Sequence, residues 1–251
     1  MSTPVLPAFD SNNFTPGQVI DNPRLPYKPG TTWVYETVDS TGAVQSYTTV
    51  TATNQTRMID GVQTTVVSDV VRDPNSGAAT EVTKDYFAQD KSGNVWYLGE
   101  DTQELKNGKV VSTQGTWHAG VNGALPGFVM EANPQVGDFY RQEFSAGVAE
   151  DKAQVIGKNG TAHVPYGHFD HLLVTRETTA LEPGAKETKS YAAGIGEVYG
   201  KDIVTGDMDK LIAVGMANSM ASFGESAPPA NAALLLSGAI DSQPMLASPH
   251  G

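Results

Sequence analysis

Histidine and carboxylate side chains are the main candidates for chemistry in this sequence, because it contains no cysteine. Without thiolates, imidazole nitrogens and carboxylate oxygens are the strong transition-metal ligands that remain. Three of the five histidines lie in one short stretch, His163-Val-Pro-Tyr-Gly-His168-Phe-Asp-His171. A fourth, His118, precedes a long segment with no evident strand.

Strand geometry decides which of these histidines could share a metal ion. Alternate residues of an extended strand share a face, so His168 and Asp170 point to one side and His171 points to the other. A divalent transition metal, zinc or copper, would therefore use His168 with Asp170, or His171 with His118. The spacing matches no metalloprotease helix motif. Ordinary surface or half-buried histidines are the simpler alternative.

Carboxylates beside a predicted turn at residues 145–148 offer a second kind of chemistry. Arg141 and Glu143 precede this turn, and Glu150 and Asp151 follow it. Two carboxyl groups in different environments can divide the roles of general acid and general base. On a barrel rim such residues are more often solvated charges, with Arg141 as their partner.

Aromatic side chains could line a binding site, although aromatic residues of strands usually fill a core. The alternative to a filled core is a lumen that holds a small, largely apolar ligand, as closed barrels allow. The candidate ligand-binding residues are Trp33, Trp96, Trp117, Tyr86, Phe128 and Met130.

Turn signals divide the chain into short strands. Asp60-Gly61 and Asn107-Gly108 are typical two-residue hairpin turns, because these residue types tolerate a positive φ. The segments between turns are rich in Thr, Val, Tyr and Trp, and apolar and polar side chains alternate in them. We expect strands at residues 31–38, 44–53, 62–72, 81–88, 94–98, 110–117, 139–144, 148–156, 169–179, 186–191, 197–199 and 210–214.

This pattern predicts a mostly β protein, an antiparallel meander that forms a barrel or a strongly curled sheet, with few short helices. Two segments stand out. Residues 118–137 show no credible strand or helix and are predicted to be a long loop that walls a pocket or plugs one end of the barrel. Residues 207–223 could form a helix, but we favour a hairpin between residues 197–199 and 210–214.

Composition and the chain ends narrow the possibilities. The 251 residues include 28 acidic and 16 basic side chains, for a net charge of −12, which argues against nucleic-acid binding and against docking on an anionic membrane. No apolar run approaches the ~20 residues of a transmembrane helix. Residues 20–215 are predicted to form one β-barrel-like domain. Residues 1–19 would be an extension without signal-peptide features, and residues 216–251 a tail or a short docking helix.

Several stretches carry a resemblance to known proteins. They are IDNPRLPYKPGTTWVYE at 20–36, YFAQDKSGNVWYLGED at 86–101, ANPQVGDFYRQE at 132–143, GVAED at 147–151, and AGIGEV at 193–198. Together they resemble a family of uncharacterised bacterial secreted or lipoprotein-like β proteins, over residues 20–214. The resemblance implies export in bacteria and a curled antiparallel sheet similar to the lipoprotein-carrier fold, and it transfers no catalytic residue. The positions of His118 and His168 are commonly acidic and small hydroxyl residues in that family, so these histidines are a local departure.

Three functional hypotheses follow. The first is a secreted or periplasmic binding protein for a small, largely apolar ligand, with a metal at His118 and His171 as an optional part of its site. The second is an enzyme on the same scaffold, a lyase or hydrolase, with His118 or His171 as base and with Glu143 or Arg141 holding the substrate. The third is a structural envelope protein without a small-molecule site.

Overall fold

The computed structural model describes residues 3–216, and β-strands make up most of that part of the chain. One 3-10 helix, Ser11–Asn13, precedes the strands. The strands in chain order are β1 (Thr31–Val38), β2 (Val44–Ile59), β3 (Val62–Arg72), β4 (Ala79–Gln89), β5 (Val95–Lys106), β6 (Lys109–Ser112), β7 (Trp117–His118), β8 (Leu125–Met130), β9 (Phe139–Arg141), β10 (Glu143–Phe144), β11 (Asp151–Val164), β12 (Gly167–Thr179), β13 (Glu187–Ala192), β14 (Gly196–Asp202) and β15 (Met208–Met216). The described residues contain no helix long and apolar enough to cross a membrane.

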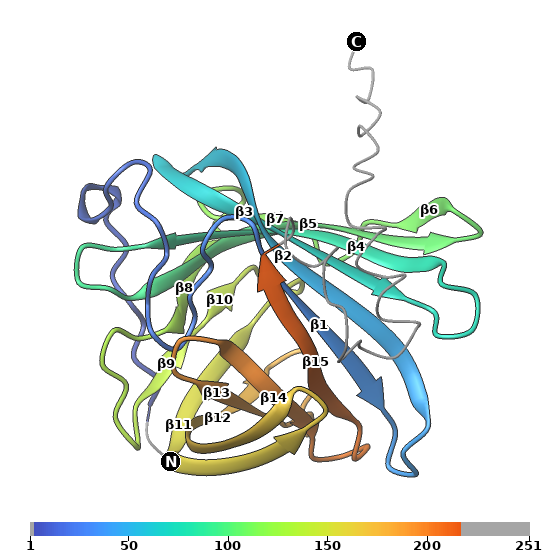
Figure 1. Cartoon of the computed structure of the whole chain (residues 1–251). Coiled ribbons are helices and arrows are strands. Elements are labelled where there is room, and N and C mark those ends of the chain that lie inside the picture. The colour runs from blue at the N-terminus through green and yellow to red at the C-terminus, as the bar shows by residue number, and fades with distance from the viewer. Residues whose placement is uncertain (1–2, 217–251) are drawn as a thin grey trace.

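All of these strands belong to one fifteen-stranded sheet with the order β10-β8-β5-β4-β3-β2-β1-β15-β14-β13-β12-β11-β9, with β6 and β7 as further partners of β5. Strands β1 to β5 and β11 to β15 are neighbours both in the chain and in the sheet, and they pair antiparallel. Figure 1 shows this sheet curling into a nearly closed barrel. The predicted fold class, a mostly β antiparallel meander that forms a barrel or curled sheet, is therefore confirmed.

Strand pairing also decides between the helix and the hairpin that were considered for the segment after residue 207. β15 pairs antiparallel with β14, with Tyr199 opposite Lys210, so this segment is the expected hairpin up to Met216. The rest of the segment proposed as a helix, and the expected C-terminal tail, lie outside the described residues.

The two ends of the sheet meet at residues 139–144. β9 pairs with β11 at one end of the strand order, and β10 pairs with β8 at the other. Only Gln142 separates β9 from β10, so one short segment serves both ends of the sheet. Closure therefore depends on this segment, which we call the seam.

Arg141 and the N-terminal residues hold the seam together. Val5 forms a parallel bridge with Tyr140, and the amide of Arg141 donates to the carbonyl of Val5 at 3.1 Å. The buried guanidinium of Arg141 donates through Nη2 to the carbonyls of Pro126, at 2.8 Å, and Pro7, at 3.2 Å. Three separate segments are thereby joined by one side chain.

The prediction of a long loop at residues 118–137 is wrong in its middle, because Leu125–Met130 form strand β8 between β5 and β10. Pro126 and Gly127 hid this strand, since both residue types normally interrupt strands. Gly127 is required there because a Cβ would lie 2.2 Å from the carbonyl oxygen of Arg141. The close approach of the seam explains why a glycine stands in a strand.

Residues 20–30 cross one end of the barrel and cover it. Ile20 and Leu25 are buried in the apolar cluster inside the barrel. Arg24 donates through Nη1 to the carbonyl of Tyr191 at 3.0 Å, at the end of β13. On the other side, the Asn22 side chain donates to the carbonyl of Gly93, in the turn between β4 and β5, at 2.9 Å. Hydrogen bonds therefore tether this segment, which we call the plug, on both sides.

A bulge at Gly99 changes which residues of β5 face the interior. Tyr97 and Glu100 are three residues apart and would face opposite sides of a regular strand. Both nevertheless line the interior, because the register between β4 and β5 shifts beside Gly99, whose φ is +142°. A Cβ at Gly99 would lie 2.4 Å from the carbonyl oxygen of Trp117. The bulge thus needs a glycine.

We predict that Gly99→Ala lowers the free energy of unfolding by about 3 kcal/mol, because it adds both a clash and an unfavourable φ. Urea denaturation followed by tryptophan fluorescence measures this loss. Gly157→Ala is the matched control, because Gly157 has an ordinary φ and a Cβ there would meet only Val174, at 3.9 Å. Equal stability of the Gly99→Ala and Gly157→Ala variants would contradict the role assigned to the bulge.

Candidate functional site

The barrel encloses a lumen made of three adjoining cavities of about 400, 220 and 190 Å³. Asp85, Lys189 and Glu197 line all three cavities, so the cavities are parts of one space. The largest falls within the roughly 300–1,000 Å³ that is typical of small-molecule sites. We treat this lumen as the candidate site.

The wall of the lumen changes from polar to apolar along the strands. The inward residues of β4 run from Glu81 through Asp85 to Phe87, and those of β13 run from Glu187 to Tyr191. Phe87 and Tyr191 belong to the interior apolar cluster, whereas the acidic residues line the largest cavity. The apolar end is the end that the plug covers, since plug residues line the smallest cavity.

Aromatic rings form this apolar end. Tyr27 of the plug contacts Trp33 of β1 edge to face, with 5.7 Å between the ring centroids. The indole N–H of Trp33 donates to the carbonyl of Ile195 at 2.7 Å, and the hydroxyl of Tyr35 donates to the carbonyl of Glu197 at 3.0 Å. Because backbone carbonyls satisfy the polar atoms of Trp33 and Tyr35, the rings of these two residues offer apolar surface to the lumen.

Carboxylates dominate the charge of the lumen. Among the described residues, Lys189 is the only cationic side chain in the wall of the largest cavity, and it forms ion pairs with Glu177 at 3.2 Å and Glu187 at 3.6 Å. The other lumen carboxylates form no ion pair with any residue among positions 3–216. The seven acidic residues that line the largest cavity are Asp69, Glu81, Asp85, Glu100, Glu187, Glu197 and Asp209.

Burial and mutual repulsion raise the pKa values of these carboxyl groups. Burial, followed by the charge of Glu81, raises the pKa of Asp69 to about 7, and burial raises the pKa of Glu197 to about 8. The pKa of Asp85 lies well above its ordinary value because of burial and the charge of Asp69, although Tyr97 donates a hydrogen bond to it at 2.6 Å. Some lumen carboxyl groups therefore carry protons near neutral pH.

Glu143 and Asp151 line the second cavity, beside the seam. Glu143 is 8% exposed, and its Oε2 has no hydrogen-bond partner within the described part of the chain. Burial and then the charge of Asp151 raise its pKa well above the ordinary value. Trp117 lies beside it, 4% exposed, with an indole N–H that also lacks an acceptor among the described residues.

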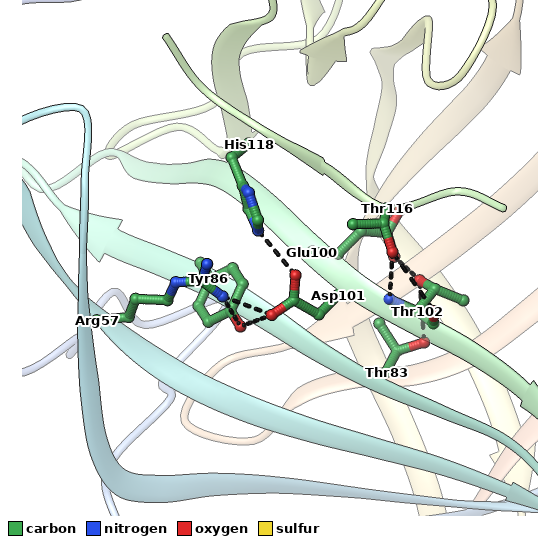
Figure 2. A network of polar contacts seen from close by, with 8 residues as sticks. All are labelled: Arg57, Thr83, Tyr86, Glu100, Asp101, Thr102, Thr116 and His118. Atoms are coloured by element: carbon green, nitrogen blue, oxygen red, sulfur yellow. Dashed lines mark hydrogen bonds and ion pairs between the residues drawn. The ribbon is translucent and has the colours of Figure 1, made fainter. Parts of the chain in front are cut away.

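His118 belongs to a separate polar network with Asp101, Tyr86 and Arg57, none of which lines the lumen (Figure 2). Its Nε2 lies 2.9 Å from Oδ1 of Asp101, whose Oδ2 accepts hydrogen bonds from the Tyr86 hydroxyl, at 2.6 Å, and from Arg57. Burial would raise the pKa of Asp101, but the hydrogen bond from Tyr86 and the charge of Arg57 lower it. This carboxylate fixes the imidazole of β7 against β5.

The structure places the other predicted catalytic residues apart from one another. Arg141 uses its guanidinium at the seam, and His171 is exposed on β12 with a φ of +51°. Glu143 is the predicted catalytic residue that lines the lumen.

Most of the predicted ligand-binding aromatics lie away from the lumen. Trp33 lines it, whereas Met130 is buried in the interior apolar cluster and Phe128 packs against both apolar clusters. A second apolar cluster contains Tyr86, Trp96 and Trp117, and Trp117 also contacts Tyr97 of the lumen wall, with 5.5 Å between ring centroids.

The four predicted metal ligands do not come together. His168 and Asp170 are exposed on β12 with His171, and the His168 ring faces that of His163 with 5.9 Å between centroids. His118 lies on β7, which pairs with β5. Within residues 3–216, no group of three histidine or acidic residues could hold a metal ion.

Sequence analysis missed the carboxylates that line the lumen. The signal was available, because acidic residues share a strand face with large apolar ones: Asp85 with Phe87, and Glu187 with Tyr191. On a half-buried strand, a charged residue at the apolar spacing faces inward. Apart from Asp170, only the carboxylates beside the turn at residues 145–148 were considered as candidates.

Comparisons with known proteins bear mainly on the resemblance noted above. No family model matches the sequence, and no curated protein matches it. Two solved structures are similar. One is described as a "putative exported protein with YmcC-like fold" from Bacteroides fragilis, with 14% identity, a TM-score of 0.46, and coverage of 76% of this chain and 98% of that chain. The other is described as a "putative lipoprotein" from Parabacteroides distasonis, with 12% identity, a TM-score of 0.40, and coverage of 76% and 97%.

These descriptions agree with the resemblance to uncharacterised bacterial secreted or lipoprotein-like β proteins. At such identities and TM-scores, the two structures carry no argument about the activity or ligand of this chain.

We predict that the protein loses stability as the pH rises from about 5 to about 8. The folded pKa values of Asp69 and Glu197, about 7 and about 8, exceed their unfolded values, so the folded state binds more protons in this interval. The expected loss is on the order of 5 kcal/mol, or about 10–20 °C in Tm. Thermal unfolding across this pH range measures it. The double variant Asp69→Asn, Glu197→Gln should show a flatter profile, and an unchanged slope would contradict the assignment.

Proposed function

We propose that the chain is a small-molecule binding protein whose lumen takes an organic cation, a protonated amine with an apolar or aromatic remainder. The observation that carries this proposal is the charge of the lumen: of the residues that the structure describes, seven carboxyl groups and one cationic side chain, Lys189, line the largest cavity. A protonated amine there would form charge-assisted hydrogen bonds with the carboxylates and reduce their mutual repulsion.

The apolar end of the lumen supports the second half of the proposal. Tyr27 and Trp33 present ring surface deep in the lumen, beyond the carboxylates. Such rings bind apolar groups, and their faces attract cations. A wholly apolar ligand, as expected from the sequence, would leave the carboxylates desolvated against hydrocarbon, which is costly. An amine with an apolar remainder satisfies both ends.

An extracytoplasmic location is part of this proposal. The resemblance of the sequence to bacterial secreted and lipoprotein-like β proteins supports it. A binding protein in the periplasm or outside the cell would meet small amines before they reach the cytoplasm.

We predict that 2-phenylethylamine and hexane-1,6-diamine bind the protein at pH 7.5, and that the neutral analogue 2-phenylethanol binds at least about tenfold more weakly, a difference of about 1.4 kcal/mol. Isothermal titration calorimetry measures the affinities. The double variant Asp69→Asn, Asp85→Asn should lose at least about tenfold in amine affinity, because two lumen carboxylates are replaced by neutral side chains.

Asp170→Asn is the control for this experiment, because Asp170 is exposed on β12 and does not line the lumen. Its amine affinity should equal that of the unaltered protein. If neither amine binds, or if 2-phenylethanol binds as well as 2-phenylethylamine, the proposed function is wrong.

A further inference from the structure

The second cavity is lined by a buried carboxyl group, that of Glu143, whose Oε2 has no hydrogen-bond partner in the described chain. The indole N–H of Trp117, outside the cavity, also forms no hydrogen bond of ordinary geometry, although its interaction with Glu143 lowers the pKa of that carboxyl group. Buried polar atoms nearly always have partners, so such orphans require an explanation. Both side chains are less than 10% exposed, and Glu143 lines the cavity. A ligand in the cavity could reach the Glu143 carboxyl group.

Asp151 lies on the same cavity and is held in place by the seam. The amide of Gln142 donates to the Asp151 carbonyl at 2.9 Å, which fixes the start of β11 beside β10. After burial, the charge of Asp151 is the main cause that raises the pKa of Glu143. The two carboxyl groups therefore form a close pair in which a charge on Asp151 disfavours a charge on Glu143.

Within residues 3–216, no cationic side chain forms an ion pair with Glu143 or Asp151. The groups that face Glu143 are Asp151 of β11, Glu100 and Tyr97 of β5, and the indole N–H of Trp117 of β7. Arg141, on the adjoining strand, directs its guanidinium to the carbonyls of Pro7 and Pro126 instead. Lys189 also lines this cavity but forms its ion pairs with Glu177 and Glu187. A second negative charge on the pair thus lacks a neutralising partner.

We propose that this side cavity is a proton-exchanging subsite for the ammonium group of the ligand, in which the amine binds between Glu143 and Asp151 as Glu143 gives up its proton. The inference rests on the proposed function and specifies where in the lumen the amine lies. The O–H bond of Glu143 breaks, its electron pair stays on the carboxylate, and the proton passes to solvent. The amine keeps its own protons throughout, so one positive charge replaces another.

Neighbouring aromatic residues would hold the rest of the ligand. Tyr97, Tyr191 and Phe87 line the same cavity, and Tyr27 lines both this cavity and the apolar end of the lumen. A ligand with its ammonium group at Glu143 could therefore extend its apolar part toward the plug without leaving the lumen. Because binding releases a proton, affinity should rise with pH by up to about tenfold per unit while Glu143 is protonated in the free protein.

The experiment is calorimetric titration of the full chain with 2-phenylethylamine at pH 7, in two buffers of different ionisation enthalpy, which gives the number of protons released per ligand. The unaltered protein should release close to one proton. Glu143→Gln should bind at least about tenfold more weakly and release close to none, and Asp151→Asn should also weaken binding. Glu104→Gln, at an exposed position of β5 outside the lumen, should match the unaltered protein.

Each outcome has one meaning. If Glu143→Gln keeps the affinity and the proton release of the unaltered protein, the amine lies elsewhere, among carboxylates such as Asp69 and Asp85, and this inference fails while the proposed function stands. Amine binding without proton release in the unaltered protein overturns the inference in the same way. Failure of the unaltered protein to bind any amine overturns the proposed function itself. Near-ultraviolet circular dichroism establishes that Glu143→Gln and Asp151→Asn are folded before their titrations are compared.

Discussion

Closure of the sheet at residues 139–144 is the constraint on which the rest of the structure depends. An open sheet leaves a row of unpaired N–H and C=O groups at each edge, and a barrel removes them by pairing one edge with the other. Here β9 and β10 divide that task, because β9 pairs with β11 and β10 pairs with β8. The same pairing brings Glu143 and Asp151 to one cavity, so closure of the fold and assembly of the candidate subsite are a single event.

The lumen contains carboxyl groups that destabilise the folded state. Seven carboxyl groups lining one cavity repel each other, and burial makes their charged forms still less favourable. Lys189 offsets part of this repulsion through its two ion pairs, and protonation offsets more. The pattern is typical of a site kept at some cost to stability. Apolar side chains at the same positions would give a more stable barrel with a filled interior.

Local chemistry was enough to predict much of the fold. The strands at Thr31–Val38 and Val62–Arg72 have the expected bounds, because Gly-containing turns frame them and alternation is clear within them. Strand β8 escaped prediction because Pro126 and Gly127 serve a contact with the seam, which lies far along the chain. A signal of that kind is not present in the local sequence.

The site was harder to predict than the fold. Arg141 and Glu143 were predicted to act together. In the structure, the Arg141 side chain binds backbone carbonyls at the seam, whereas Glu143 lines the lumen. His118 was chosen for its residue type, and it lies with Asp101 in the network that does not line the lumen. The lumen carboxylates could be found only by asking which face of each strand they share, and the bulge at Gly99 alters that face for Glu100.

Pairing between distant segments also has a consequence for the order in which the chain folds. Val5 pairs with Tyr140, and one edge of β1 pairs with β15, so neither pairing can form until the later segment has been synthesised. A chain that emerges N-terminus first therefore keeps the edge of β1 unpaired until almost all described residues have been synthesised. Contacts of such long range make folding slow, and the waiting edge can pair with other chains. The hairpins from β1 to β5 can form early, whereas the barrel closes only after β15 has been synthesised, and the edge of β1 stays unpaired during that interval.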